Sequence, residues 1–185
     1  MEVRHSRRVH LTVRQMEPVE ARLVIDYFHS STPEHLELLG VDPTRLPEPD
    51  RWLATYVEDA RKPLTERNSL LVVWEVDGEP VGFSTADTIT FGREARMHLH
   101  IVDPERRRAG IGVRCVRETA QLYFDVLQLE RLICEPNAFN VAPNRTLQRA
   151  GFRYDKTHMT VPNRLNYHQA VTRWVLERGA SPTSA

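Results

Sequence analysis

The chain has 185 residues, which is enough for one domain with a sizeable hydrophobic core and short for two. Its 25 lysines and arginines balance its 25 aspartates and glutamates, so no net charge draws it to nucleic acid or to a membrane surface, and neither partner is expected. The longest apolar runs are strand-sized and no charged-then-apolar leader opens the chain, so we expect no membrane span, no secretory signal and a cytoplasmic location.

The first third of the chain predicts one strand and three helices. Alternating apolar and polar side chains are typical of a half-buried strand, whereas apolar side chains three and four residues apart are typical of a helix. These patterns predict a strand at residues 8–15 and helices at residues 19–28, from Thr32 onward, and at residues 50–60. In the third helix Trp52 and Tyr56 have the spacing of core residues, and contact with a substrate is the alternative interpretation.

The remainder predicts strands at residues 69–76, 81–90, 95–102, 131–135, 152–161 and 167–176, and helices at residues 113–127 and 142–150. Asp77-Gly78 predicts a tight hairpin turn. Cys115 and Cys134 have no metal-ligand spacing, so we expect buried, reduced thiols and no metal site. One domain over residues 1–178 and a disordered tail over residues 179–185 complete the expected organisation.

A glycine loop lies between the predicted strand at residues 95–102 and the helix that follows. Gly110 and Gly112 leave the backbone bare where that helix begins, so N–H groups and the helix dipole can face an anion. Residues 106–108, all arginine, add positive charge. A dinucleotide fingerprint would need a third glycine where Cys115 stands, and a P-loop would need Gly-Lys-Ser/Thr, which is missing here. The loop therefore predicts a phosphate site of another kind.

Two signatures resemble those of the GNAT superfamily of N-acetyltransferases. The first is the pattern Arg/Gln-x-x-Gly-x-Gly/Ala, filled by Arg107, Gly110 and Gly112, which resembles the acetyl-CoA loop of that family. The second is Asn140, followed by a short helix that ends in Gly-Phe. The resemblance covers residues 9–177 and implies an α/β GNAT fold. That fold has a single mixed, mostly antiparallel sheet, splayed at its central parallel strand pair, with helices on both faces.

The resemblance implies that acetyl-CoA is the co-substrate and that the loop backbone holds its pyrophosphate. A backbone N–H of the preceding strand, which maps to Val102, would polarise the thioester carbonyl. Asn140 matches an asparagine that hydrogen-bonds the cofactor arm, whereas Asn144 either joins it or caps the helix. The cofactor contacts implied are Ile101, Val102, Arg107, Arg108, Ala109, Gly110, Ile111, Gly112, Asn140 and Asn144.

The reaction also needs a base, because an alkylamine with a pKa of about 10 is mostly protonated at neutral pH. His98 and His100 are the candidates, since strand alternation puts both on the same side as Val102. The arylalkylamine N-acetyltransferases of this family carry a histidine pair on this strand. His98 takes the place of their second histidine, whereas Arg96 stands at the place of the first. Ordinary strand histidines, one packed and one solvated, are the alternative.

The chain departs from the family at the group that protonates the departing thiolate. Leu147 stands where many members have a tyrosine, and Pro143 stands where some have a serine. Tyr154, Tyr167 and water are the alternatives for that proton. The source of the proton is left open by the sequence.

The leading interpretation is an enzyme that moves the acetyl group of acetyl-CoA to a primary amine of a small molecule or a protein N-terminus. The alternative is a catalytically weak acetyl-CoA-binding module that acts as a sensor or partner, which the missing tyrosine permits. Residues 19–67 do not identify the acceptor, and His168 and Gln169 are candidates to face its cavity. Dimers are common in the family, so a homodimer is among the expected assemblies.

Overall fold

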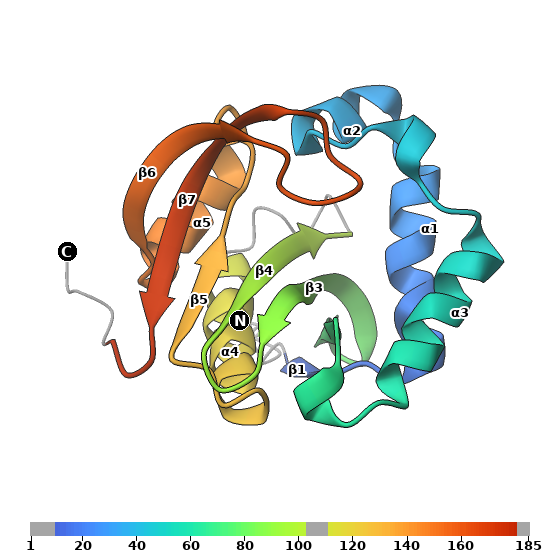
Figure 1. The fold of residues 1–185 in the computed structure, drawn as a ribbon, viewed down its shortest axis with the longest axis horizontal. Coiled ribbons are helices and arrows are strands. Elements are labelled where there is room, and N and C mark those ends of the chain that lie inside the picture. The colour runs from blue at the N-terminus through green and yellow to red at the C-terminus, as the bar shows by residue number, and fades with distance from the viewer. Residues whose placement is uncertain (1–9, 103–110, 181–185) are drawn as a thin grey trace, which may run out of the picture.

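The computed structural model describes residues 10–102 and 111–180, which form one seven-stranded sheet flanked by helices (Figure 1). The strand order is β1-β2-β3-β4-β5-β7-β6, and every neighbouring pair is antiparallel except β4 and β5, which are parallel. This mixed α/β sheet confirms the expected fold class. The strands are β1 (Leu11–Gln15), β2 (Leu70–Val76), β3 (Glu79–Thr90), β4 (Glu94–Ile101), β5 (Arg131–Cys134), β6 (Arg153–Thr160) and β7 (Gln169–Glu177).

The helices begin and end at local signals. The Thr32 side chain accepts a hydrogen bond from the His35 amide at 3.2 Å and so caps α2, and Gly151 ends α5 with a φ of 104°. The helix expected at residues 19–28 divides into a 3-10 turn and an α-helix that starts at Arg22. The helical elements are η1 (Pro18–Ala21), α1 (Arg22–Ser30), α2 (Pro33–Leu39), η2 (Pro43–Arg45), α3 (Pro49–Ala60), η3 (Leu64–Glu66), α4 (Ile111–Val126) and α5 (Val141–Ala150).

Helices cover both faces of the sheet, as the resemblance implied. On one face α4 and α5 pack over a core that includes Trp74 and Tyr123. On the other face α1, α2 and α3 pack over a second core that includes Phe28 and Phe83. Successive side chains of a strand point to opposite faces, so the central strands supply both cores and a one-residue slip would expose them. None of the helices in the described ranges has the length and apolar character needed to cross a membrane.

The two central parallel strands pair over only part of their length. The pairs run from Glu94 with Arg131 to Arg96 with Ile133, whereas β4 continues to Ile101. Beyond the last pair the two strands diverge, which Figure 1 shows at their arrowheads. This is the expected splay, and it opens the sheet in the middle of the molecule.

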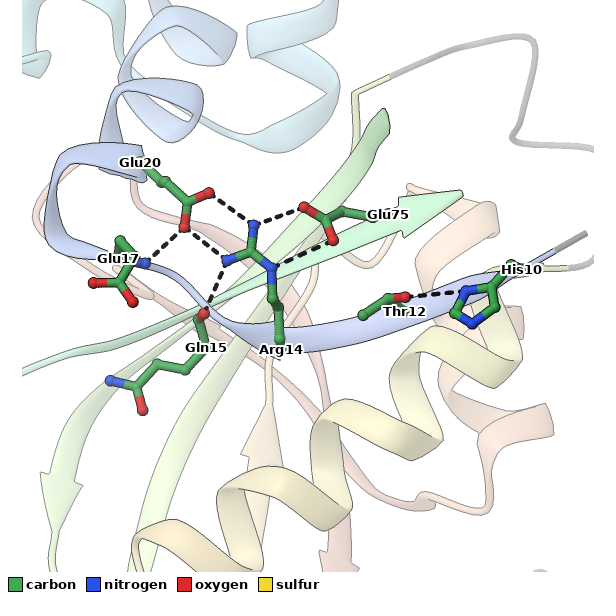
Figure 2. Close-up of polar contacts among 7 residues, drawn as sticks. All are labelled: His10, Thr12, Arg14, Gln15, Glu17, Glu20 and Glu75. Carbon is green, nitrogen blue, oxygen red and sulfur yellow. Dashed lines mark hydrogen bonds and ion pairs between the residues drawn. The ribbon is translucent and has the colours of Figure 1, made fainter. Parts of the chain in front are cut away.

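An arginine network ties the start of α1 to the edge of the sheet (Figure 2). Arg14 on β1 donates two hydrogen bonds of 2.8 Å to Glu20 and bonds of 2.6 and 3.3 Å to Glu75 on β2. The hydrogen bonds from Arg14 lower the pKa of Glu20 below its ordinary value, so this carboxylate is charged at neutral pH. Because η1 leads directly into α1, the network helps to place the helix that carries Phe28.

The two cysteines are free and buried, which confirms the expectation for them. Burial raises the pKa of Cys115 to about 12 and also raises the pKa of Cys134 above its ordinary value. Both thiols are therefore protonated at neutral pH and unreactive as nucleophiles. Of the tail expected at residues 179–185, Gly179 and Ala180 form a turn after β7, and the rest lies outside the described residues.

Candidate active site

A cavity of about 580 Å³ opens where β4 and β5 separate. Its walls come from α1, α3, β3, β4, the end of β5 and residues 162–166 of the β6–β7 connection. That connection reaches across the sheet toward α2 (Figure 1), where the Asp42 amide donates to the Leu165 carbonyl at 2.8 Å. The cavity thus joins the splayed strands to the helices of the first third of the chain.

The candidate histidines both face this cavity. His98 lies opposite Thr85 and His100 lies opposite Phe83 in the β3–β4 ladder, and both line the cavity wall together with Arg96. Strand alternation therefore puts the two histidines on one side, as predicted.

The two histidines have different surroundings. The His98 ring nitrogen Nε2 lies 2.9 Å from Oδ2 of Asp87, whereas His100 packs among three aromatic rings. The ring centroids of Tyr27, Phe28 and Phe83 lie 5.1, 5.2 and 4.9 Å from that of His100. His98 thus has a carboxylate partner in Asp87, and His100 is packed against aromatic rings.

Asp87 is a site residue that sequence reasoning missed. Burial raises its pKa, but the charge and the hydrogen bond of His98 outweigh this effect and hold the pKa of Asp87 below its ordinary value. The carboxylate is therefore ionised at neutral pH and accepts a hydrogen bond from His98 Nε2. This assigns the free lone pair of a neutral His98 to Nδ1.

A second missed residue is Glu135, a buried carboxylate just after β5. Its side chain is 2% exposed and lies 2.8 Å from Arg173 Nε, 3.5 Å from Arg96 Nε and 3.4 Å from His158 Nε2. Arg96 also donates to the carbonyl of Pro162. The cluster joins β4, β5, β6, β7 and the β6–β7 connection, so Arg96 serves to hold the cavity wall together.

The predicted cofactor loop lies largely outside the described residues, namely Arg107, Arg108, Ala109 and Gly110. Ile111 and Gly112, the two remaining loop positions, begin α4. A Cβ added to Gly112 would lie 3.5 Å from the Ile101 side chain, so the start of α4 packs against the end of β4. The described residues on either side of the loop positions thus form the expected strand and helix.

The structure corrects the expected orientation of the Val102 amide. Its N–H donates to the carbonyl of Val81 at 2.9 Å, and Ser84 Oγ donates to the His98 carbonyl at 2.5 Å. The main-chain groups of Val102 and His98 therefore face β3, which leaves the Val102 amide unable to face a thioester in the splay. The main-chain N–H and C=O groups of successive strand residues point to opposite sides, so those of Leu99 point toward the β5 side of β4. Leu99 lies beyond the last β4–β5 pair, so these groups face the gap between the two strands.

The two candidate asparagines have different roles. Asn144 donates from Nδ2 to the carbonyls of Asn137 and Asn140 at 3.0 and 2.7 Å, and its Oδ1 accepts from Trp174 Nε1 at 2.7 Å. These bonds make Asn144 a brace between α5 and β7. Asn140 lines the cavity at the start of α5, and within the described ranges its side chain makes no capping hydrogen bond.

Asn140→Ala should weaken acetyl-CoA binding by at most about tenfold without unfolding the chain, because one hydrogen bond contributes about 0.5–1.5 kcal/mol net. Asn144→Ala is the matched control: it breaks the bonds to Trp174 and the α5 start, so it should lower Tm more than Asn140→Ala does. Calorimetric titration and thermal denaturation measure the two effects. An unchanged Kd for acetyl-CoA in Asn140→Ala would show that this residue has no contact with the cofactor.

The tyrosines considered as proton donors to the thiolate differ in whether they line the cavity. Tyr154 and Tyr167 are exposed and do not line the cavity, and the Tyr154 hydroxyl lies 3.3 Å from Thr157 Oγ1. Gln169 lines the cavity but His168 does not. Tyr56, by contrast, lines the cavity from α3, and burial raises its pKa to about 12 against smaller opposing effects of Trp52 and Arg164.

Comparisons with known proteins agree with this architecture. The model of the acetyltransferase (GNAT) family matches residues 32–152. No curated protein matches the chain. The fold is similar to that of a spermidine N-acetyltransferase from Vibrio cholerae, solved with CoA and spermine, with a TM-score of 0.74 and 16% identity over 92% of this chain and 96% of that one. It is also similar to an aminoglycoside acetyltransferase solved with coenzyme A, with a TM-score of 0.66 and 18% identity over 92% of this chain and 96% of that one.

Proposed function

The chain belongs to the acetyltransferase (GNAT) family, an enzyme family whose co-substrate is acetyl-CoA, and from this premise we propose that it acetylates a primary amine of a small molecule. The observation that carries the proposal is the His98–Asp87 pair in the cavity at the splayed strands. It supplies the base that such a reaction requires, at the place where the strands separate.

The described residues fit the thioester end of acetyl-CoA. The Asn140 side chain and the Leu99 main chain both border the splay, and the start of α4 lies at its end. We assign the polarisation of the thioester carbonyl to the main-chain N–H of Leu99 and not to that of Val102. The Leu99 N–H faces the gap between β4 and β5, whereas the Val102 N–H is bonded to β3. Acetyl-CoA supplies the activated acyl group, and these residues bind and orient it.

His98 then removes the proton that blocks the acceptor nitrogen. Its Nδ1 takes one proton from the ammonium group, and the negative charge of Asp87 stabilises the imidazolium that forms. The freed nitrogen forms a bond to the acyl carbon as the carbon–sulfur bond breaks, and the electron pair leaves with sulfur. The acylated nitrogen then loses its second proton, and the thiolate takes it up, which completes the amide and the free thiol. Neither Tyr154 nor Tyr167 lines the cavity, so water is the favoured carrier of this proton.

The competing function is an acetyl-CoA-binding module without chemistry. A paired, half-buried base favours the enzyme, since a sensor has no need of a proton acceptor at the acyl group. A screen of small amines and peptides against acetyl-CoA, read by thiol release, tests this. We expect saturable CoA release with at least one amine. If the chain binds acetyl-CoA tightly but no amine of the panel causes CoA release, the result would support the binding module and contradict the enzyme assignment.

We also propose a cytoplasmic location, in which the free thiols Cys115 and Cys134 stay reduced. Both thiols contribute to the core beneath α4 and α5, so their oxidation would disturb its packing. The homodimer expected from the resemblance stays a prediction, which sedimentation of the purified chain would test.

A further inference from the structure

Three carboxylates of the cavity, two buried and one half-buried, are neutralised by the protein's own groups. Glu135 is paired with two arginines, as described above. Asp59 lies 2.9 Å from Lys62 Nζ and accepts further hydrogen bonds from residues 68 and 69. Asp87 is held by His98. Among the described lining residues only the exposed Glu58 is left for a further ammonium group, so an acceptor with several such groups would have to break existing pairs, which is costly for buried charges.

Two charged side chains of the described cavity lining are not neutralised by another group of the protein. Arg164, on the β6–β7 connection, and Glu58, on α3, are exposed, and in the described part of the chain neither side chain makes an ion pair or a hydrogen bond. The charge of Arg164 reaches the phenol of Tyr56, where it opposes the rise of the Tyr56 pKa that burial causes. The lining residues that the structure describes thus include one available cation and one available anion.

The wall between α1 and α3 is aromatic. The rings of Phe28 and Trp52 stack with centroids 5.9 Å apart, and those of Trp52 and Tyr56 stack with centroids 6.2 Å apart. All three residues line the cavity. This wall can bury an apolar or aromatic group of a ligand. The volume of about 580 Å³ lies in the usual range of about 300–1,000 Å³ for small-molecule sites.

We infer that the acceptor is a small amino acid-like molecule, with one primary amine, one carboxylate and an apolar or aromatic side group, and that it is not a polycation. Arg164 binds the carboxylate, the wall of Phe28, Trp52 and Tyr56 takes up the side group, and the amine points toward His98. The inference rests on the proposed function, since it names the acceptor of the same site.

The first test compares L-phenylalanine, L-phenylalaninamide and spermidine as acceptors for the wild-type chain, read by CoA release. The amide keeps the amine and the ring but lacks the carboxylate. We expect the KM for phenylalanine to be lower than that for the amide by about fivefold or more, since an arginine–carboxylate pair is a charge-assisted hydrogen bond. A higher kcat/KM for spermidine than for phenylalanine would overturn the inference and leave the enzyme assignment in place.

Arg164→Gln tests the carboxylate contact directly. We expect it to raise the KM for phenylalanine by about tenfold, equivalent to about 1.4 kcal/mol, with kcat little changed and the KM for phenylalaninamide within twofold. Arg61→Gln is the matched control, because Arg61 is an exposed arginine just after α3 that does not line the cavity. Equal effects of Arg164→Gln on both acceptors, or equal effects of the two variants, would overturn the assignment of Arg164.

A binding measurement separates this inference from the proposed function. Calorimetric titration of the chain with N-acetyl-L-phenylalanine and with its amide, in the presence of CoA, requires no turnover. We expect the carboxylate form to bind more tightly by about fivefold or more, and Arg164→Gln to remove the difference. Equal affinities in the wild-type chain would contradict the inference whether or not acetylation occurs. Absence of amine-dependent turnover together with a clear carboxylate preference would count against the proposed function only.

Discussion

His98→Ala should lower kcat by about a hundredfold or more at neutral pH while the Kd for acetyl-CoA stays nearly unchanged, because general bases typically contribute about 10²–10⁴-fold. His98 faces the cavity with its Nε2 held 2.9 Å from Asp87, so alanine removes both the proton acceptor and its orientation. Steady-state kinetics with the best acceptor and calorimetry with acetyl-CoA measure the two quantities. A fall in kcat without a change in the Kd for acetyl-CoA would indicate loss of the base and not loss of cofactor binding.

His100→Ala is the control on the same strand and side. It removes a ring that packs against Phe28 and Phe83, so it should lower Tm more than His98→Ala does and lower kcat less. The double variant tests whether His100 relays the proton. If activity at pH 7 stays within twofold of wild type in both single variants and in the double variant, the proton leaves by another path, through water held by the strand backbone.

The pH dependence follows from the Asp87 carboxylate. Because the pKa of Asp87 is lowered in the folded chain, its pairing with His98 stabilises the fold at pH values above the unfolded pKa and is lost as pH falls through the folded pKa. In Asp87→Asn this pH-dependent part of the stability should disappear, so the free energy of unfolding should fall less on acidification than it does in the wild-type chain. The substitution also removes the carboxylate that holds His98 Nε2, so kcat at neutral pH should fall. Chemical denaturation at neutral and acidic pH measures the first effect, and an unchanged pH dependence of stability together with an unchanged kcat would show that Asp87 does not act on His98.

Gly110→Asp should weaken acetyl-CoA binding by about a hundredfold or more. Gly110 directly precedes α4, whose first residue is Ile111, so an aspartate there would place a negative charge where the pyrophosphate is expected. Hydrogen bonds to charged groups contribute about 1.5–3 kcal/mol each, and the loss of two of them accounts for such an effect. Calorimetric titration with acetyl-CoA measures it.

Gly110→Asn is the matched control, since asparagine has nearly the same size and no charge. Aspartate and asparagine are both favourable residues at a helix N-cap, so neither variant should destabilise α4. Affinity should therefore fall much further in the aspartate variant than in the asparagine variant, at similar Tm. Wild-type affinity in Gly110→Asp would remove the loop from the cofactor site.

Signals that act within a few residues predicted most of the elements. Thr32 caps α2, and Asp77-Gly78 forms the β2–β3 turn with φ angles of 53° and 85°. Alternation along β4 put His98 and His100 on one side. Each of these depends on the backbone preference or the hydrogen bond of one short segment, so the chain encodes it locally.

The partner of His98 depended on the register of the β3–β4 hairpin. If β3 and β4 paired without a bulge from Thr90 and Glu94 onward, Ala86 would lie opposite His98, and the Asp87 side chain would point to the other face of the sheet. A bulge at residues 87–90, where Thr88 has a φ of 50°, shifts the register by one and brings Asp87 to the side of His98. The expected role of the Val102 amide was wrong because it depended on which side of β4 that amide faces.

The amino-acid order was thus sufficient for the family signatures, the caps, the turns and the shared face of His98 and His100, all of which arise between near neighbours in the chain. The setting of the site was decided by contacts between distant segments. Glu135 is surrounded by Arg96, Arg173 and His158 from three other strands, and Arg164 comes to the cavity on the connection between the last two strands. These contacts form only when the sheet assembles with its bulge and its splay, because tertiary packing alone brings residues so far apart in sequence within hydrogen-bonding distance.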